Sequence, residues 1–188
     1  IEEIKKKINK KTKVILPVHI SGRGSNIKKI LEITNRKKIT VIEDAAEAFM
    51  STFKNKFLGT YGKIGCFSFA PNKIITTGQG GVIVTNDKSI YKKISRLKDQ
   101  GRVAPTALGE DNYISIGYNF KFTDLQASLG LSQLDSITKR VKTLKNHYRF
   151  YKKNIKENKN FRIIKFDLKN GELPLWTDVV CSNRHKLF

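Results

Sequence analysis

The 188-residue chain lacks several features that would assign it to a class at once. It has only two cysteines, Cys66 and Cys181, far apart and outside any metal-ligand spacing, so we predict neither a metal site nor a disulfide framework. No apolar run reaches the roughly eighteen residues of a membrane-spanning helix, and no apolar signal core opens the chain. These absences favour a cytoplasmic protein without a membrane partner.

Acidic residues are also scarce. The chain has 16 Asp and Glu against 37 Lys and Arg, a net charge of +21. Such an excess raises the possibility of a nucleic-acid-binding domain, which would bind in a salt-sensitive way. However, lysine supplies most of the charge and is spread along the chain, and aromatic residues and arginines are not clustered with it. We therefore predict no nucleic-acid partner, while an anionic small ligand fits the charge.

The apolar residues that are present gather in short runs. Four runs are predicted to be buried strands, because they are rich in Val, Ile and Phe without strict alternation: Val14–Val18, Thr40–Ala45, Ile64–Ala70 and Gly81–Thr85. Too few residues separate the last two for a helical crossover, so a hairpin or a loop-rich link joins them. Otherwise helical patterns lie between or after the runs. This alternation predicts a layered α/β fold with a mainly parallel sheet.

Three helices are predicted from the spacing of apolar residues. Ser25 can cap the first, which runs to about Asn35. The second starts near Asp87 and runs to about Gln100, where Gly101 is suited to end it. A single long helix starts at Thr123 and is followed by a strand-like run at 161–166, and the last residues read as the start of another helix. We expect residues 1–135 to be part of a large domain, and 136–188 to be a linking helix and the start of a smaller domain.

One candidate site lies at the end of the second apolar run, where Glu43-Asp44-Ala45-Ala46-Glu47-Ala48 follows. Ligands of parallel α/β sheets sit outside the carboxyl ends of the strands, so Asp44 is placed where a ligand would be. A helix N-cap aspartate is the alternative for this residue taken alone.

A second candidate site follows the third run. Lys73 stands in a loop bounded by Pro71 and by the glycine-rich stretch at 78–81, and a lysine in a desolvated pocket can form a Schiff base. Ser68, the threonines at 76 and 77 and the glycine-rich backbone can donate hydrogen bonds to a phosphate. An exposed loop lysine is the alternative. A carboxylate and a lysine with phosphate donors at neighbouring strand ends are what pyridoxal 5'-phosphate (PLP) requires.

The motifs together resemble the DegT/DnrJ/EryC1/StrS family of PLP-dependent sugar aminotransferases. This resemblance implies the fold of type I PLP enzymes, whose large domain is a three-layer α/β structure with a mainly parallel sheet. The resemblance rests on motifs in the right order: the run from Glu43 to Ala48, Leu58-Gly59-Thr60, Gly65-Cys66-Phe67-Ser68-Phe69, Asn72-Lys73, the stretch from Thr76 to Gly81, Gly117-Tyr118-Asn119-Phe120 and Thr123-Asp124-Leu125-Gln126-Ala127. Gln79 departs from the pattern, since many members have Glu there. The chain is also about half the usual length, so we expect it to be a fragment.

The resemblance implies roles for five residues. Lys73 would carry the cofactor as a Schiff base and act in catalysis, and Asp44 would pair with the pyridinium nitrogen. Glu47 would lie by the ring and its phenolic oxygen, and Ser68 would bind the phosphate. Asn119 would reach the cofactor phosphate of a neighbouring subunit, which implies a homodimer.

The implied reaction has two halves. An amino donor, usually glutamate, converts PLP to its amine form, which then aminates a nucleotide-linked keto-sugar in polysaccharide or amino-sugar biosynthesis. Two alternatives stay open: a sugar-dehydratase-like relative, in which His replaces the lysine, and an inactive or regulatory truncated homologue.

Two further residues carry weaker expectations. His19 follows the first strand and either faces the site or is a structural loop histidine. Trp176, in the stretch Pro174-Leu175-Trp176-Thr177, is expected to serve packing.

Overall fold

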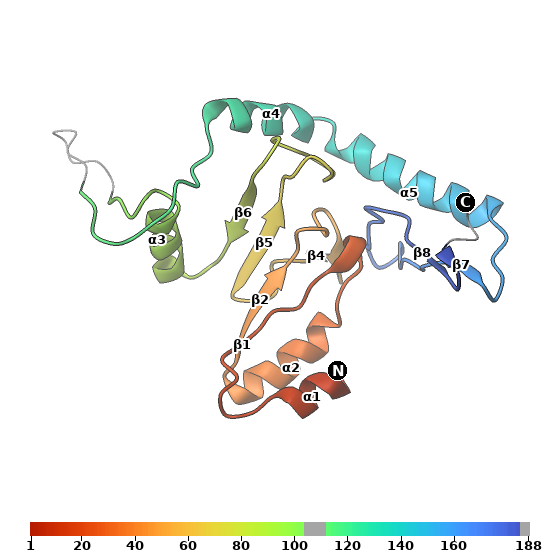
Figure 1. The fold of residues 1–188 in the computed structure, drawn as a ribbon, viewed down its shortest axis with the longest axis horizontal. Coiled ribbons are helices and arrows are strands. Elements are labelled where there is room, and N and C mark those ends of the chain that lie inside the picture. Colours follow the sequence, from red (N-terminus) through yellow and green to blue (C-terminus); the bar gives the residue numbers. More distant parts are fainter. Residues whose placement is uncertain (104–111, 185–188) are drawn as a thin grey trace.

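A computed structural model describes residues 1–103 and 112–184 of the chain. Its centre is a four-stranded sheet in the order β1-β2-β5-β6, formed by β1 (Val14–Ile15), β2 (Thr40–Asp44), β5 (Ile64–Ser68) and β6 (Gly81–Val84) (Figure 1). β1, β2 and β5 run parallel, whereas β6 runs antiparallel to β5. The predicted α/β fold with a mainly parallel sheet is therefore confirmed.

The four predicted strands are all present, although each is shorter than its apolar run. The first run shortens most, because Pro17 has no backbone N–H for a ladder and only an isolated bridge joins Val18 to Asp44 beyond it. β5 and β6 are joined by the loop 69–80, as expected from their short separation. A small hairpin between β2 and β5, formed by β3 (Thr52–Phe53) and β4 (Lys56–Phe57), was not predicted.

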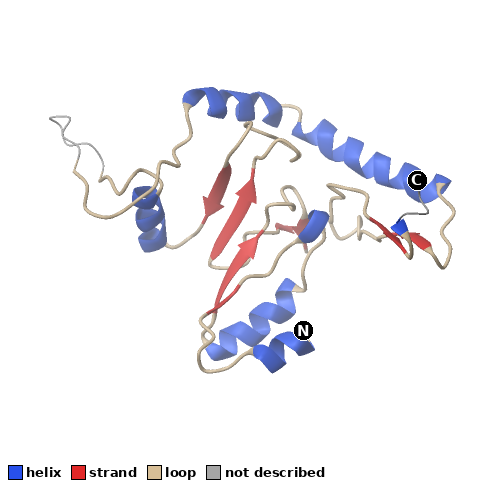
Figure 2. Ribbon diagram, in the orientation of Figure 1, coloured by secondary structure: helices blue, strands red, loops and turns tan. Residues whose placement is uncertain are grey.

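Helices α1 (Glu2–Lys7) and α2 (Ile27–Lys37) lie together on one side of the sheet (Figure 2). The N-cap of α2 is Asn26, whose side chain accepts a hydrogen bond from the backbone N–H of Lys29. The predicted cap, Ser25, was thus wrong by one residue. Asp87 caps α3 (Lys88–Leu97), since its carboxylate accepts bonds from the second and third helical N–H groups.

The long helix predicted from Thr123 is two helices, α4 (Asp124–Leu134) and α5 (Ile137–Asn154). Thr123 begins α4 with a complete capping box. The break falls at Ser136, whose hydroxyl and backbone N–H both donate to the carbonyl of Gln133. A serine that bonds locally to the backbone in this way competes with helical hydrogen bonding, and the apolar periodicity could not reveal that.

After α5 the chain forms a second small sheet from β7 (Phe161–Ile163) and β8 (Val179–Cys181), which lies beside α5 in Figure 1. β8 was not predicted, and the expected helix start falls partly on residues 185–188, outside the described residues. Tyr148 of α5 packs with Ile163 and Phe166 in a core of its own. This separate core agrees with a domain boundary near residue 136, which stays a prediction.

The main core lies between α2 and the sheet. Ile27 and Ile30 of α2 are buried against Val41 of β2, with Ala45, Ala48 and Leu58 completing the cluster. A short 3-10 turn, Ile20–Gly22, connects β1 to the loop before α2.

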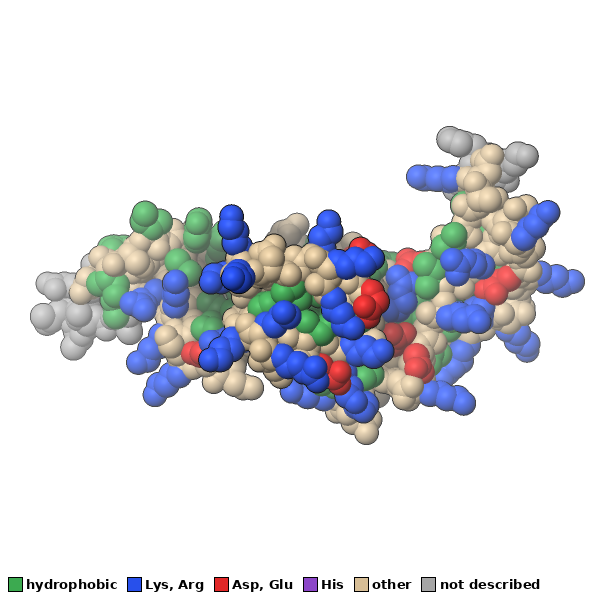
Figure 3. Space-filling view, turned by 90° about the horizontal axis from the view of Figure 1, so that it is seen from below, with side chains coloured by type: hydrophobic (Ala, Val, Ile, Leu, Met, Phe, Trp, Pro, Cys, Tyr) green, Lys and Arg blue, Asp and Glu red, His purple; other side chains and the backbone are tan. Residues whose placement is uncertain are grey.

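Of the helices that the structure describes, none is long and apolar enough to cross a membrane. Lys and Arg side chains are spread over the face shown in Figure 3 rather than gathered at one place.

Candidate active site

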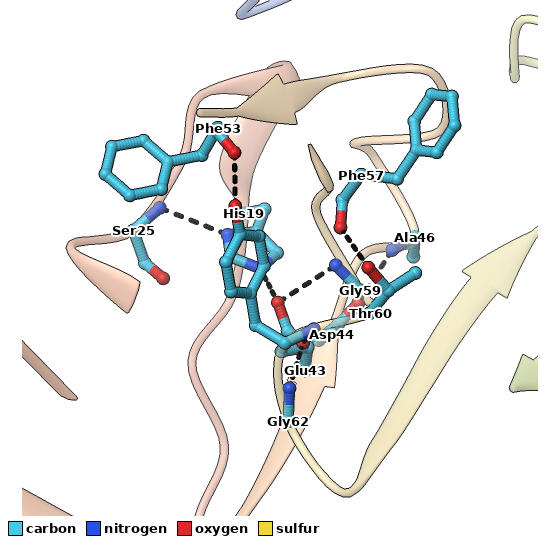
Figure 4. A network of polar contacts seen from close by, with 11 residues as sticks. His19, Ser25, Glu43, Asp44, Ala46, Phe53, Phe57, Gly59, Thr60 and Gly62 are labelled. Carbon is cyan, nitrogen blue, oxygen red and sulfur yellow. Dashed lines mark hydrogen bonds and ion pairs between the residues drawn. The ribbon is translucent and has the colours of Figure 1, made fainter. Parts of the chain in front are cut away.

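A buried carboxylate organises the loops at the carboxyl end of β2. Burial alternates along this strand, so that Glu43 faces the interior like Val41 and is fully buried. Its oxygens accept hydrogen bonds from the backbone N–H groups of Gly59 at 2.9 Å, Tyr61 at 2.6 Å and Gly62 at 2.6 Å (Figure 4). Glu43 therefore holds the turn before β5 against the end of β2.

His19 supplies the fourth contact of this carboxylate. Its Nε2 lies 2.9 Å from Glu43 Oε2, and its Nδ1 accepts the backbone N–H of Ser25 at 3.1 Å. This pattern assigns the proton to Nε2, which donates to the carboxylate. Because the ring is fully buried and both nitrogens are engaged, His19 is the structural histidine of the two alternatives.

The pKa of Glu43 reflects these contacts. Burial alone would raise the pKa of this carboxyl group, but hydrogen bonds from His19, Gly62 and Gly59 outweigh burial and bring the pKa below its ordinary value. Glu43 is therefore ionised at neutral pH.

Asp44 ends β2 with its backbone fixed on both sides. Its N–H donates to the carbonyl of Pro17, and its carbonyl accepts the N–H of His19. One carboxylate oxygen accepts the N–H of Ala46 at 3.0 Å, and the side chain is half-buried. The structure thus places a rigid carboxylate at the carboxyl edge of the sheet, where the sequence predicted it.

Lys73 lies next to Glu47 and against an aromatic ring. Its N–H closes a turn onto the carbonyl of Ala70, and its side chain is only 11% exposed. The Nζ atom lies 4.0 Å from Glu47 Oε1 and 5.0 Å from the centre of the Trp176 ring. The other Glu47 oxygen accepts the N–H of Ser21 at 2.7 Å, so a positioned carboxylate holds the lysine. The alternative of an exposed loop lysine is wrong.

Ser68 is the last residue of β5 and pairs with Gly81 of β6. Its hydroxyl oxygen accepts the N–H of Ala70 at 3.2 Å, which leaves its hydrogen for another acceptor. In contrast, the hydroxyls of Thr76 and Thr77 donate to the carbonyls of Phe69 and Gln79. These threonines stabilise the glycine-rich loop, so their predicted role as phosphate donors is not what their contacts show.

Asn119 lines a cavity whose lining includes none of the other four predicted residues. It forms a bridge with Asp99 after α3 and lines a separate cavity of ≈ 780 Å³ together with Phe67, residues 79–83 and Gln126. The chain therefore brings Lys73 and Glu47 together near the end of β2 and places Asn119 at another part of the surface.

Two parts of the site were not predicted from the sequence. Glu43 was read only as part of a motif, although a carboxylate inside an apolar strand signals a buried and fully paired group. Trp176 was expected only to pack, and its approach to Lys73 spans about a hundred residues of sequence, which no local pattern could reveal.

The model of the DegT/DnrJ/EryC1/StrS aminotransferase family matches residues 1–186, almost the whole chain. The chain belongs to this aminotransferase family. The resemblance seen in the motifs is therefore confirmed, while the roles of Lys73, Asp44 and Ser68 stay predictions.

Relatives within the family include the GDP-perosamine synthase of Escherichia coli O157:H7, which is 41% identical over 82% of this chain and 42% of its own length. The GDP-perosamine synthase of Vibrio cholerae is 38% identical over 81% of this chain and 41% of its own length. This family member thus spans about two fifths of the length of these curated relatives.

Among solved structures, the chain is similar to Helicobacter pylori PseC, an aminotransferase involved in the biosynthesis of pseudoaminic acid. The TM-score is 0.89 with 26% identity, over 96% of this chain and 48% of the other. An E. coli GDP-4-keto-6-deoxy-D-mannose-3-dehydratase with bound hydrated PLP has the same fold, with a TM-score of 0.86 and 24% identity over 97% of this chain and 50% of the other. At that identity the likeness extends to the fold alone.

Proposed function

We propose that this chain is part of a PLP-dependent aminotransferase that transfers an amino group, from glutamate, to a nucleotide-linked keto-sugar in polysaccharide or amino-sugar biosynthesis. Family membership supports the reaction class, and the relatives named GDP-perosamine synthase support the substrate class. The observation that carries the proposal is the enclosed Lys73 amine, which is 11% exposed and lies 4.0 Å from the Glu47 carboxylate.

The residues present fit PLP. Asp44 offers a carboxylate oxygen at the edge of the sheet, Lys73 an amine shielded from solvent, and Ser68 a hydroxyl hydrogen at the end of the adjacent strand. When bound, PLP supplies an electron sink for the bonds around the transferred nitrogen. Of the two small residues that follow Asp44, Ala45 is buried in the core and Ala46 is partly exposed.

Each side chain has one task in this proposal. Asp44 holds the proton on the ring nitrogen, which a carboxylate stabilises as a cation. Lys73 would hold the cofactor through its amine, and the same amine could give or take a proton beside it. Glu47 orients the lysine, and Ser68 donates to the phosphate. The network of Glu43 and His19 keeps the Asp44 backbone in place.

A homodimer forms the second part of the proposal. Asn119 lies in a segment rich in exposed apolar side chains, including Ile116, Phe120 and Leu125, which are 88%, 72% and 81% exposed. Apolar surface of this kind supports contact with another surface, and a second copy would bring Asn119 to a neighbouring cofactor. We also place the protein in the cytoplasm, which its two free cysteines support.

The dehydratase alternative is weaker because it requires histidine in place of Lys73. The regulatory or inactive alternative is also weaker, since Asp44, Glu47 and Lys73 are all present and positioned.

The deciding experiment is cofactor attachment. The chain, and in parallel the longer reading frame that contains it, are incubated with PLP, reduced with borohydride and mapped by peptide mass spectrometry. We expect a reduced adduct on Lys73 that is absent in Lys73→Arg, whose guanidinium forms no Schiff base. An exposed lysine of α5, Lys142→Arg, is the matched control and should leave the adduct unchanged. Absence of an adduct from both forms of the protein would overturn the proposal.

A further inference from the structure

The segment 171–176 is fixed against two loops of the large sheet. Its backbone makes a ladder of contacts with residues 21–24 and 51–52: the N–H of Thr52 donates to Gly171, the N–H of Leu173 to Ser51 Oγ, and the N–H of Leu175 to the carbonyl of Ser21. Glu172 Oε1 accepts the N–H of Gly24 at 2.9 Å. Hydrogen bonds to both loops therefore fix the position of the segment 171–176.

The close approach depends on a glycine. Gly22 has φ of +92°, and a Cβ atom there would lie 1.8 Å from the carbonyl oxygen of Leu173. The Ser51 side chain bridges the backbones of Gly22 and Leu173. Its hydroxyl donates to the Gly22 carbonyl at 2.8 Å, and its oxygen accepts the Leu173 N–H. Such tight backbone contact sets the position of the residues that follow.

Trp176 follows directly and presents its ring to the Lys73 amine at 5.0 Å. An ammonium group at this distance is attracted to the ring face. Trp176 is only half-buried, so its own chain does not enclose it completely. The C-terminal part of the chain thus contributes one wall to a site whose other residues come from β2 and the loop after β5.

The chemistry of transamination determines which part of the substrate would lie next to Trp176. The sugar carbon that receives the amino group has to approach the transferred nitrogen to about 3–3.5 Å. With PLP held by Lys73, that nitrogen would lie at the lysine amine, so the sugar ring would lie beside the lysine and within reach of Trp176. Ligand pockets commonly use aromatic side chains as apolar walls, and a pyranose ring presents C–H groups on a face that suits such a wall.

We propose that Trp176 contacts the sugar ring of the nucleotide-linked acceptor, and so contributes to the acceptor half of the reaction. The inference rests on the proposed function. It also predicts an asymmetry: glutamate has no sugar ring, so the donor half-reaction should depend much less on Trp176.

The test measures the two half-reactions separately in the PLP-loaded full-length enzyme, from the absorbance of the cofactor. Glutamate starts the first half. GDP-4-keto-6-deoxy-D-mannose and the corresponding UDP-linked 4-keto-6-deoxy sugar are the acceptor probes for the second. In Trp176→Ala we expect KM for the acceptor to rise about tenfold, the equivalent of one good aromatic contact. The rate with glutamate should change less than about twofold.

Three variants accompany this measurement. Trp176→Phe keeps an aromatic face and should stay near wild type, whereas Trp176→Leu keeps apolar bulk without that face and should behave like the alanine variant. Should Trp176→Ala fail to fold, the comparison of Phe with Leu decides the question. Phe150→Ala removes an aromatic side chain of α5 that is 63% exposed, and serves as the control with unchanged KM.

The outcomes separate the inference from the proposed function. An unchanged acceptor KM in both Trp176→Ala and Trp176→Leu overturns the role of Trp176 alone, as does an equal loss in both half-reactions. A wild-type enzyme that carries PLP on Lys73 but aminates neither sugar overturns the sugar-acceptor function and this inference together. A wild-type enzyme without an adduct on Lys73 overturns the aminotransferase proposal at its first step.

Discussion

The loops around β2 and the segment from Tyr113 to Leu134 differ in which side chains they bury and which they expose. Around β2, polar groups are buried and paired, with His19 and Glu43 both 0% exposed. In the later segment, apolar groups are exposed, and the largest exposed fractions belong to Ile116 and Leu125. The polar groups around β2 find hydrogen-bond partners within the chain. The apolar side chains of the later segment, in contrast, are not covered by other described residues. Paired, buried polar groups and exposed apolar side chains thus lie in different parts of the chain.

The largest loss of folding stability is expected from a substitution of Glu43. In Glu43→Gln, one accepting oxygen becomes an amide nitrogen, so part of the set of N–H donors around it loses its partner. The replaced oxygen accepts two of the four bonds, and each buried donor left unpaired costs about 1–3 kcal/mol, so the free energy of unfolding should fall by about 3–5 kcal/mol. Chemical denaturation measures the change. Glu32→Gln, at an exposed residue of α2, is the control with a change below about 1 kcal/mol. Equal stability of the two variants would contradict the role of the network.

The contact between residues 22 and 173 should be the next most sensitive. Gly22→Ala places a methyl group against the Leu173 carbonyl and should lower the free energy of unfolding by about 3 kcal/mol, because the backbone must separate. Gly78→Ala is the matched control, since Gly78 also has positive φ, +78°, but open space around its Cβ position. It should lose only about 1–2 kcal/mol from backbone strain. Thermal unfolding that ranks the two variants the other way would refute the close contact.

A smaller effect is expected from acid. The pKa of Glu43 lies below its ordinary value in the folded protein, so its contribution to stability is complete above the pKa that the unfolded chain has. It is lost as the pH falls from there through the lower pKa of the folded state. The stability difference between wild type and Glu43→Gln should therefore shrink over this acid range, as measured by denaturation at a series of pH values. A difference that is constant with pH would show that the charge of the Glu43 carboxylate does not contribute to folding stability.

The smallest effect on stability is expected in the exposed segment. Leu125→Ser should change the free energy of unfolding by less than about 0.5 kcal/mol, because this side chain is 81% exposed. The same variant should weaken the proposed homodimer, which light scattering after size-exclusion chromatography measures. A stable dimer in both proteins would place the subunit contact elsewhere. A large loss of folding stability would mean that Leu125 packs within its own chain.

Much of the fold was predictable because it depends on local patterns. The apolar runs at 40–45 and 64–70 became adjacent parallel strands, and Asp87 and Thr123 start helices with side-chain caps, which are short-range features. Errors arose where contacts decided the outcome. Ser136 ended a helix that apolar spacing would have continued, and the hairpin β3–β4 has too few residues to show a strand pattern.

The candidate site divides in the same way. The sequence by itself indicated Asp44, Glu47, Ser68 and Lys73 as candidates, with Asp44 and Ser68 at strand ends and the other two in the loops that follow, because motif and strand order suffice for that. Only the tertiary structure decided that Lys73 is enclosed by Glu47 and Trp176, that His19 is a buried partner of Glu43, and that Thr76 and Thr77 serve the loop. The physical reason is that burial and hydrogen-bond partners depend on groups distant in the sequence, which come together only when the backbone segments pack.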